Sequence, residues 1–218
     1  MRSIHITTSI SNPSDTAFAS AVTGSSFTLV SNEFTSEYIK NGNEAQKLAH
    51  KIVITNNSST NHSAKTAVIT GIDQDGNEQT ETINLPGSSG TSDSAKYYRK
   101  LNSVVPSASI GSDTMKIGVK DEICSPTFPQ DYGNYFAQNV AVNVRVGGTI
   151  NYTVQQTLDQ IQTNNRDSIN FENSTESSVV NVASNGTATY ATPPKAIRVV
   201  INSYTYSSNT DFEFNIVP

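Results

Sequence analysis

Runs of alternating apolar and polar residues, separated by clusters of Gly, Asn, Asp and Ser, recur along almost the whole chain. Such alternation puts successive side chains on opposite faces of a strand, so each run predicts a β-strand with one buried face. The runs lie at residues 2–10, 25–31, 51–57, 66–72, 77–85, 95–104, 114–120, 138–146, 149–157, 177–184, 187–191, 195–204 and 211–217. We therefore predict an all-β protein.

Helical periodicity is weak throughout the chain. Residues 32–51 include EYIKNGNEAQKLAHK, but Asn41-Gly42-Asn43 interrupts this segment, so we expect one or two short helical turns there at most. Residues 158–168, LDQIQTNNRDS, leave room for one further turn. The fold class that follows is two β-sandwich-like domains with short helical turns at most.

A break in the strand rhythm suggests where the two domains meet. The segment 125–136, SPTFPQDYGNYF, contains two prolines and a glycine and predicts a linker or a long crossover. A chain of 218 residues is long enough for one large β domain or two smaller ones. We therefore predict an N-terminal β domain at 1–135 and a C-terminal β domain at 136–218.

Turn residues in the second half predict how its strands are connected. Gly147-Gly148 is a strong two-residue hairpin signal between the runs at 138–146 and 149–157. Ser184-Asn185-Gly186 and Ser207-Ser208-Asn209 supply further turns, and the second of these predicts a closing hairpin over residues 195–217.

The composition is polar but poor in charge. Apolar residues make up 35% of the chain and charged residues 15%, so Ser, Thr and Asn fill much of the rest. Disordered chains are usually rich in charge, whereas a Thr-rich, uncharged chain fits sheets with one solvated face. The net charge of -5 argues against nucleic-acid binding, and we interpret the basic run KYYRK, at 96–100, as a solvated strand edge.

Cysteine usage and hydropathy restrict the compartment. Cys124 is the single cysteine, so no intrachain disulfide can form, and its neighbours favour a packed thiol over a nucleophile. The N-terminus MRSIHITTSI lacks the apolar core of a signal peptide, and no run of about 18 apolar residues occurs. We expect a soluble protein made in a cytosol, with no membrane partner.

The stretch DQDGN, at 73–77, is either a calcium loop or a turn. Asp73, Asp75 and Asn77 alternate like the early ligands of a helix–loop–helix calcium site. That loop needs Gly at its sixth position and Glu at its twelfth, whereas here Gly76 falls fourth and Asn84 twelfth. We therefore predict a β-hairpin turn and no metal site.

Other candidate chemistry is weak. His5, His50 and His62 lie in separate segments without the spacing of zinc ligands. Glu78 and Glu81 could form the carboxylate pair of a glycosidase, but their positions are also those of surface carboxylates on a solvated strand. The nucleophile elbow GxSxG, the P-loop and GxGxxG are missing from the sequence. We predict a protein that is not an enzyme and has no catalytic, cofactor-binding or metal-binding residues.

The order of the segments resembles a family of virion structural proteins of tailed bacteriophages. The resemblance rests on the opening MRSI and HKIVITNN, and on TAVITGIDQDGNEQTETINLPGSSGTSDSAKYYRKLNSV. In the second half it rests on VRVGGTINYTVQQTLDQI and ATPPKAIRVVINSYTYSSNTDFEFNIV, so most of the chain is covered. The resemblance implies a non-enzymatic virion component, made in the host bacterial cytoplasm, with the major capsid protein or other virion proteins as partners. It transfers no catalytic residue.

Several roles are compatible with this resemblance. The first is a capsid decoration (cement) protein that binds the shell. The alternatives are a head–tail connector, a tail or fibre-associated component, or a carbohydrate-binding module for host glycans. In the last case Tyr97, Tyr98, Tyr204 and Tyr206 would be exposed and would stack against sugars.

We also expect a homo-oligomer, as a dimer or trimer. The uncharged strand Arg2 to Ile10 is a candidate for pairing between chains, with an ordinary strand of its own sheet as the alternative. In the closing segment, Val199 to Ile201 put apolar groups on both faces, which suggests either an interface or a central strand.

Overall fold

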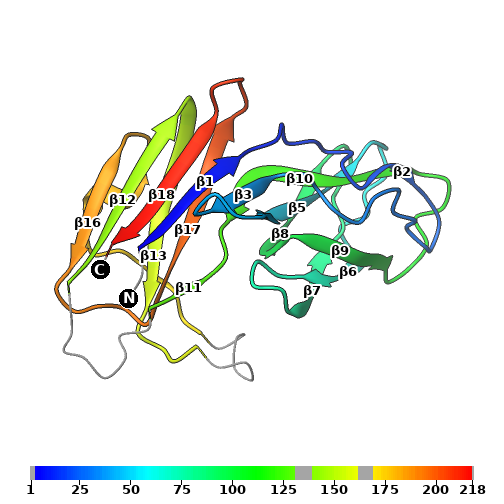
Figure 1. Cartoon of the computed structure of the whole chain (residues 1–218). Helices are drawn as coiled ribbons and strands as arrows, with labels where there is room; N and C mark the ends of the chain where they lie inside the picture. The colour runs from blue at the N-terminus through cyan, green and yellow to red at the C-terminus, as the bar shows by residue number, and fades with distance from the viewer. Residues whose placement is uncertain (1–2, 131–138, 162–168, 218) are drawn as a thin grey trace. The chain divides into compact units, whose positions relative to one another are not determined.

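The computed structural model describes residues 3–130, 139–161 and 169–217, and this part of the chain is nearly all β (Figure 1). The one helical element in these ranges is a short 3₁₀ turn, η2 (Ser177–Val179). The predicted all-β class is therefore confirmed. The chain divides into two compact units: unit 1 comprises Met1–Ser11, Ser36–Gln46 and Cys124–Pro218, and unit 2 comprises Asn12–Thr35 and Lys47–Ile123.

Unit 1 is built from two groups of antiparallel strands. The first is a sheet in the order β16 (Gly186–Tyr190), β12 (Val140–Gly147), β18 (Asp211–Val217), β1 (Ile4–Ser9), β3 (Glu37–Lys40) and β4 (Ala45–Lys47). The second places β13 (Thr149–Thr157) between β14 (Glu172–Asn173) and β17 (Ala196–Thr205), with β15 (Val180–Val182) on β13 and β11 (Phe128–Pro129) on β17.

Aromatic side chains join the two groups of strands in unit 1. Tyr152 of β13 meets Phe212 of β18 edge to face, with ring centroids 5.7 Å apart. Phe128 of β11 lies 6.0 Å from Phe214 of β18 by the same measure. All four rings are buried, and along β18 strict alternation turns Phe212 and Phe214 inward together. Unit 1 is therefore sandwich-like.

Unit 2 has two groups of strands around its own core. One contains β2 (Ala19–Val22), β10 (Met115–Cys124), β5 (Ala49–Asn56) and β8 (Thr91–Tyr98), and the other is a sheet in the order β7 (Glu78–Asn84), β6 (Thr66–Ile72) and β9 (Lys100–Pro106). A cluster of buried side chains, among them Ile54, Ile69, Leu101 and Ile117, fills the space between them. The run expected as one strand over 95–104 is interrupted at Arg99. Its first part is the end of β8 and its second part is the start of β9.

The two units are not the consecutive segments 1–135 and 136–218 that the sequence suggests. Strand β1 pairs with β18 along its whole length, from Ile4 opposite Ile216 to Ser9 opposite Asp211. Its other edge pairs with β3, where Thr7 lies opposite Ile39. The N-terminal strand thus completes a sheet made largely from the C-terminal part, and unit 1 combines two segments from the first part of the chain with residues after Ile123.

This pairing also corrects the expected role of Arg2 to Ile10. Both edges of β1 are occupied within its own sheet, so this strand offers no free edge for pairing between chains. In the closing segment, Val199, Val200 and Ile201 are all buried, and β17 pairs with β13 throughout. Each segment is an internal strand, which was the alternative to an interface.

The expected hairpins of the second half are arches between the two groups of strands. Strands β12 and β13 flank Gly147-Gly148 but pair with different partners: β12 with β16 and β18, and β13 with β17. Residues 207–209 connect β17 to β18 in the same way, so residues 195–217 form no hairpin. The chain therefore crosses from one group of strands to the other twice, from β12 to β13 and from β17 to β18.

The segment 32–51 holds strands instead of the expected helical turns. Asn41 and Gly42 have φ angles of 53° and 73°, and the amide of Asn43 donates to the carbonyl of Lys40 at 2.9 Å. This is the geometry of a tight hairpin turn that connects β3 to β4. The predicted turn at 158–168 lies largely outside the described residues, as does the second half of the predicted linker at 125–136, whose first half contains strand β11.

Candidate functional site

The DQDGN stretch forms a turn that is closed by its own hydrogen bonds. Strands β6 and β7 pair from Thr66 opposite Asn84 to Ile72 opposite Glu78, which confirms the predicted hairpin. The Asp73 carboxylate accepts hydrogen bonds from the backbone amides of Asp75 and Asn77, both at 2.8 Å. Gly76 has a φ of 92°, a conformation that glycine adopts without strain. The carboxylate is thus used to order the loop.

The three histidines lie apart. His5 is on the solvent-facing side of β1 in unit 1, while His50 and His62 are buried in unit 2. Nε2 of His62 lies 2.9 Å from the Asp113 carboxylate, and Lys65 donates to its Nδ1 at 3.2 Å. The side-chain hydrogen bonds from Thr60 and His62 hold the pKa of Asp113 below its ordinary value. This cluster ties two loops together and has the features of a structural contact.

Glu81 also has a structural role. Its carboxylate accepts hydrogen bonds from the backbone amides of Ala95, at 2.6 Å, and Lys96, at 3.1 Å. These amides belong to the part of β8 where its pairing with β5 shifts register. Glu78 is exposed at the start of β7. The two carboxylates therefore do different things and form no catalytic pair.

The four tyrosines proposed to stack against sugars do not form a platform. Tyr98 and Tyr204 are buried, and the Tyr204 hydroxyl donates to the carbonyl of Ser11 at 2.8 Å. The Lys51 ammonium lies 5.6 Å from the centre of the Tyr97 ring, which leaves Tyr206 as the exposed member of the set. These four residues therefore do not form the exposed tyrosine surface that the carbohydrate-binding alternative requires.

A network of charged side chains crosses β8, β5 and β10 in unit 2. Lys51 pairs with Glu122 at 2.5 Å, and Lys120 contacts both Glu122 and Asp93 at 2.8 Å. Burial works to raise the pKa of Glu122, but the hydrogen bonds from Lys120 and Lys51 outweigh it and lower that pKa. Each of these charged groups is paired with one of opposite sign on a neighbouring strand position. The network is therefore better explained as a contact between strands than as a catalytic site.

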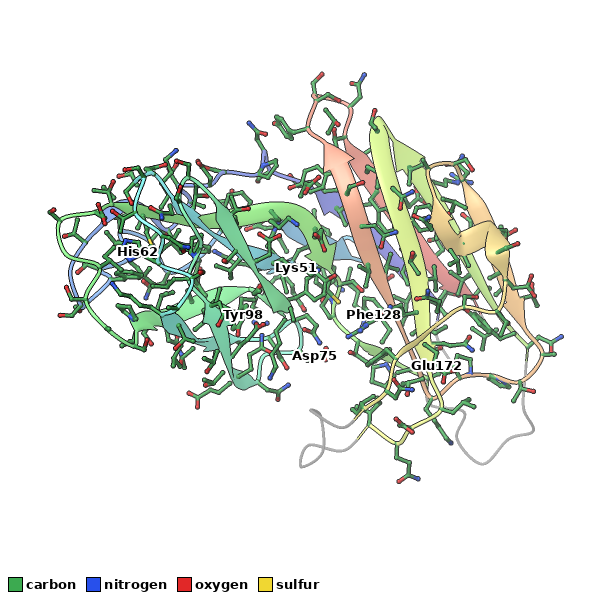
Figure 2. The ribbon with its side chains drawn as sticks, turned by 180° about the vertical axis from the view of Figure 1, so that it is seen from behind. Lys51, His62, Asp75, Tyr98, Phe128 and Glu172 are labelled. Carbon is green, nitrogen blue, oxygen red and sulfur yellow. The ribbon has the colours of Figure 1, made fainter. Side chains whose placement is uncertain are left out.

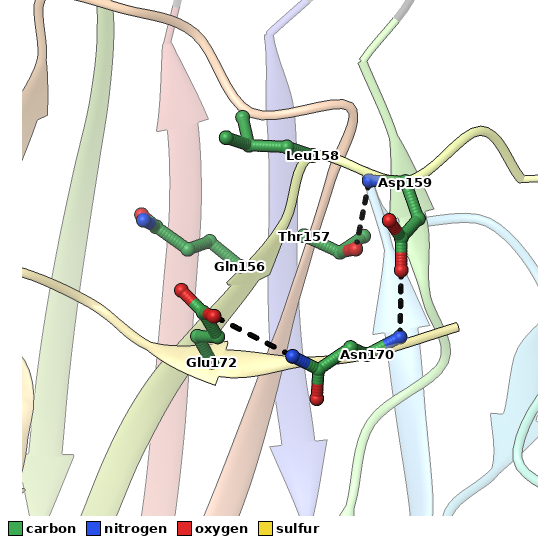
Figure 3. A pocket seen from close by; sticks show the side chains of 6 residues that line it. All are labelled: Gln156, Thr157, Leu158, Asp159, Asn170 and Glu172. Atoms are coloured by element: carbon green, nitrogen blue, oxygen red, sulfur yellow. Dashed lines mark hydrogen bonds between the residues drawn. The ribbon is translucent and has the colours of Figure 1, made fainter. Parts of the chain in front are cut away.

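A small recess lies at the end of β13 in unit 1 (Figure 3). Its volume is about 90 Å³, against the roughly 300–1,000 Å³ of typical ligand pockets. Asp159 accepts from the backbone amide of Asn170 at 2.8 Å, and the Asn170 side chain donates to Glu172 at 3.4 Å. In Figure 3 the carboxylates of Asp159 and Glu172 point in different directions and do not converge on one point.

The labelled side chains of Figure 2 show how the polar groups are distributed. Lys51, His62, Asp75 and Tyr98 lie at separate places in unit 2 and converge on no common cavity. Within the described ranges, no group of three or more His, Cys, Asp or Glu residues could hold a metal ion. Cys124 is buried, as its sequence context suggested. No helix in the described part of the chain has the length and apolar character to cross a membrane.

A broad polar surface lies on the outer face of the six-stranded sheet in unit 1. Its strands alternate strictly, so each presents every second side chain to solvent. Cross-strand register aligns these side chains in rows. One row contains Thr187, Asn143, Asn215 and His5, and the next contains Arg145, Glu213, Thr7 and Ile39.

Hydrogen bonds between neighbours order part of this face. Nδ1 of His5 contacts the side-chain oxygen of Asn215 at 2.5 Å, and Asn215 donates to Glu213 at 2.9 Å. Thr7, Thr187 and Arg145 remain exposed. A flat surface of this kind suits contact with another macromolecule and has no enclosed space for a small substrate. Sequence reasoning missed this surface, because its rows depend on β1 lying beside β18. The two strands are about two hundred residues apart in the chain.

Comparisons with protein-family models and with curated proteins find no match to this chain.

Proposed function

We propose that this protein is a non-enzymatic structural component of a tailed-bacteriophage particle, and that it decorates the capsid shell. The sequence support is the order of its segments, which resembles virion structural proteins over most of the chain. The chemical support is that Asp113, Glu122 and Lys120, whose pKa values are shifted, are engaged in contacts that hold strands and loops together.

The observation that carries the proposal is the outer face of the six-stranded sheet. Five of its strands, from β16 to β3, span about 20 Å at a strand spacing of about 4.8 Å, and each presents about 20 Å of length. This gives about 400 Å², or about half of the roughly 800 Å² that one partner contributes to a standard interface. The face carries Arg145 and three carboxylates, Glu213, Asp211 and Glu37, among uncharged groups. Most of its groups are uncharged, so a partner that pairs the carboxylates can bury it without leaving a charge unmatched.

Copy number is the experiment that tests this function. In purified particles, we expect a band-intensity ratio to the major capsid protein that corresponds to hundreds of copies. A ratio of a few to tens of copies would instead assign the protein to the connector, tail or fibres. Absence from purified particles would overturn the virion assignment.

Binding by variants tests the face itself. Shells that lack the protein should bind the wild type and should lose binding when Thr7→Lys and Asn143→Lys are combined, because two lysines would be buried at the contact. The matched control is Thr82→Lys, at an exposed position on β7 of unit 2. Equal binding by the face variant and the control would show that another surface meets the shell.

A further inference from the structure

His50 is the buried ionisable group whose surroundings are least suited to its charged form. It lies on β5 with 1% of its surface exposed. Nδ1 of the imidazole lies 3.3 Å from the backbone carbonyl oxygen of Lys120, which accepts a hydrogen bond from the Nδ1–H. Nε2 is buried and has no hydrogen-bond partner. The ring of Phe34 meets the imidazole edge to face, with centroids 4.9 Å apart.

A second proton would have no acceptor at this site. A neutral imidazole with its proton on Nδ1 leaves an unused lone pair at Nε2, which is a modest cost. An imidazolium places an unpaired N–H and a full charge in the same apolar surroundings, which costs far more. Burial accordingly lowers the pKa of His50 to about 4, and the bond to the Lys120 carbonyl opposes this only in part.

The charged groups on the neighbouring elements do not compensate. Lys51, the next residue on β5, points to the other face of the strand and pairs with Glu122. On β10, Glu122 is also held by Lys120, and on β8, Asp93 is held by Lys120. Glu33, beside Phe34, is held by Lys47. Asp121 of β10 is half-buried, and neither nitrogen of the imidazole is bonded to it.

Tyr98, opposite His50 on β8, is neutral, because burial and the nearby Glu81 raise the pKa of its hydroxyl. Because Nδ1 bonds to the Lys120 carbonyl and Nε2 has no partner, no carboxylate in the described part of the chain is hydrogen-bonded to the His50 ring.

The two units differ in whether their histidines are buried. The chain has three histidines, and the one in unit 1, His5, is exposed. His62, the other histidine of unit 2, is buried but both of its ring nitrogens have a partner, the Asp113 carboxylate at Nε2 and the Lys65 ammonium at Nδ1. His50 is thus the buried histidine with an unpartnered ring nitrogen.

We propose that His50 is a pH-sensitive switch that opens unit 2 in mild acid while unit 1 keeps its fold. The sign follows from proton linkage. A histidine exposed by opening binds its proton from about pH 6.5 downward, whereas the buried ring does so only near pH 4. Between these values the open state holds more protons, so stability is lost as the pH falls. Above pH 6.5 both states are neutral at His50 and the effect vanishes.

Hydrogen exchange measured on the full chain tests this proposal. From the two pKa values, the equilibrium constant for opening unit 2 should be about 20-fold larger at pH 5 than at pH 7. Protection factors of the β5, β8 and β10 amides should fall by this factor, and those of β1, β12 and β18 should change little. Comparison at pH 5 separates the histidine from the carboxylates, most of which titrate lower.

Two variants separate His50 from the other histidines. His50→Phe keeps a ring against Phe34 and removes the proton site, so the 20-fold loss should disappear. His62→Gln is the matched control in the same unit and should retain it. A parallel loss of protection in the wild type and His50→Phe would overturn the proposal, as would an equal loss in unit 1.

A direct titration covers the case in which His50→Phe does not fold. The imidazole resonances of the wild type should show a midpoint well below pH 6 for one histidine, and that signal should belong to His50. A midpoint at or above pH 6 for His50 would overturn the proposal without any variant.

Discussion

The carboxylate of Asp211 occupies the space that a β-carbon on Gly147 would fill. These two residues are cross-strand partners at the end of β12 and the start of β18. Each stands at the entrance to an arch that crosses between the two groups of strands in unit 1. The carbonyl of Asn209, in the second arch, would lie 2.8 Å from the same β-carbon. Gly147 is therefore required because the two arches pack against each other.

Replacement of Gly147 by alanine should destabilise unit 1 by about 1–3 kcal/mol, since a side chain there forces the backbone of the second arch to move. The control is Gly87→Ala in unit 2, where the added carbon would have 3.6 Å to its nearest neighbour. Chemical denaturation of both variants checks this. Addition of Asp211→Ala should recover only part of the loss, because the Asn209 carbonyl remains.

Asp73 should stabilise its hairpin without calcium. Asp73→Ala removes the acceptor for two backbone amides and should cost about 1–2 kcal/mol. Asp73→Asn keeps one oxygen and should cost less. The melting temperature of the wild type should be the same with calcium and with a chelator. A rise of several degrees with calcium would indicate a metal site, since binding to the native state stabilises it by mass action.

These residues also show what the sequence can and cannot predict. Local turn chemistry is readable where one motif has one meaning, so DQDGN was correctly identified as a hairpin turn. Gly147-Gly148 carries an equally strong turn signal, yet it forms an arch, because strand pairing is decided by distant partners such as β17 and β18. Asn41-Gly42 shows the opposite error. Its residues suit a hairpin turn, and the structure has one there, but beside EYIK and EAQKLAHK the sequence favours an interrupted helix.

The division into units was not predictable for the same physical reason. Alternation shows which face of β1 is buried but not which strand lies beside it. The unusual surroundings of His50 likewise depend on Phe34 and Lys120, residues that approach it only in the folded chain.

Glu81 should contribute more to stability than its neighbour Glu78. Glu81→Ala would leave the Ala95 and Lys96 amides without their acceptor and should cost about 1–3 kcal/mol. Glu81→Gln keeps one acceptor oxygen and should fall between the wild type and the alanine variant. Glu78→Ala, at an exposed position on the same strand, should change stability by less than about 0.5 kcal/mol. Equal effects of Glu81→Ala and Glu78→Ala would contradict the assigned role.

Ile6 and His5 provide a matched pair on β1. Ile6 is 3% exposed and faces the core of unit 1, whereas His5 faces solvent. Ile6→Ala should cost about 2–5 kcal/mol through lost burial and the cavity left behind, and His5→Ala should be close to neutral. Thermal unfolding followed by circular dichroism measures both. A small effect of Ile6→Ala would mean that β1 is not an integral strand of this sheet.

Cleavage of the chain between the two predicted domains should not separate the two pieces. An engineered protease site within 125–136 would leave β1 and β3 on the N-terminal piece and β12, β13, β17 and β18 on the C-terminal piece. Strand β1 would still pair with β18 from Ile4 to Ser9, inside a sheet with a buried face. The pieces should therefore run separately on a denaturing gel and elute together from a native sizing column.

Thr7→Pro supplies the control for this experiment. Proline at a central strand position removes a ladder hydrogen bond and clashes with the extended pairing on one side. Thr7 lies between Glu213 and Ile39, so its replacement disturbs both edges of β1 at once. The cleaved Thr7→Pro variant should dissociate under conditions in which the cleaved wild type stays together. If the cleaved wild type also dissociates without denaturant, then residues 1–135 and 136–218 are independent domains, and the pairing of β1 with β18 is not what holds the two pieces together.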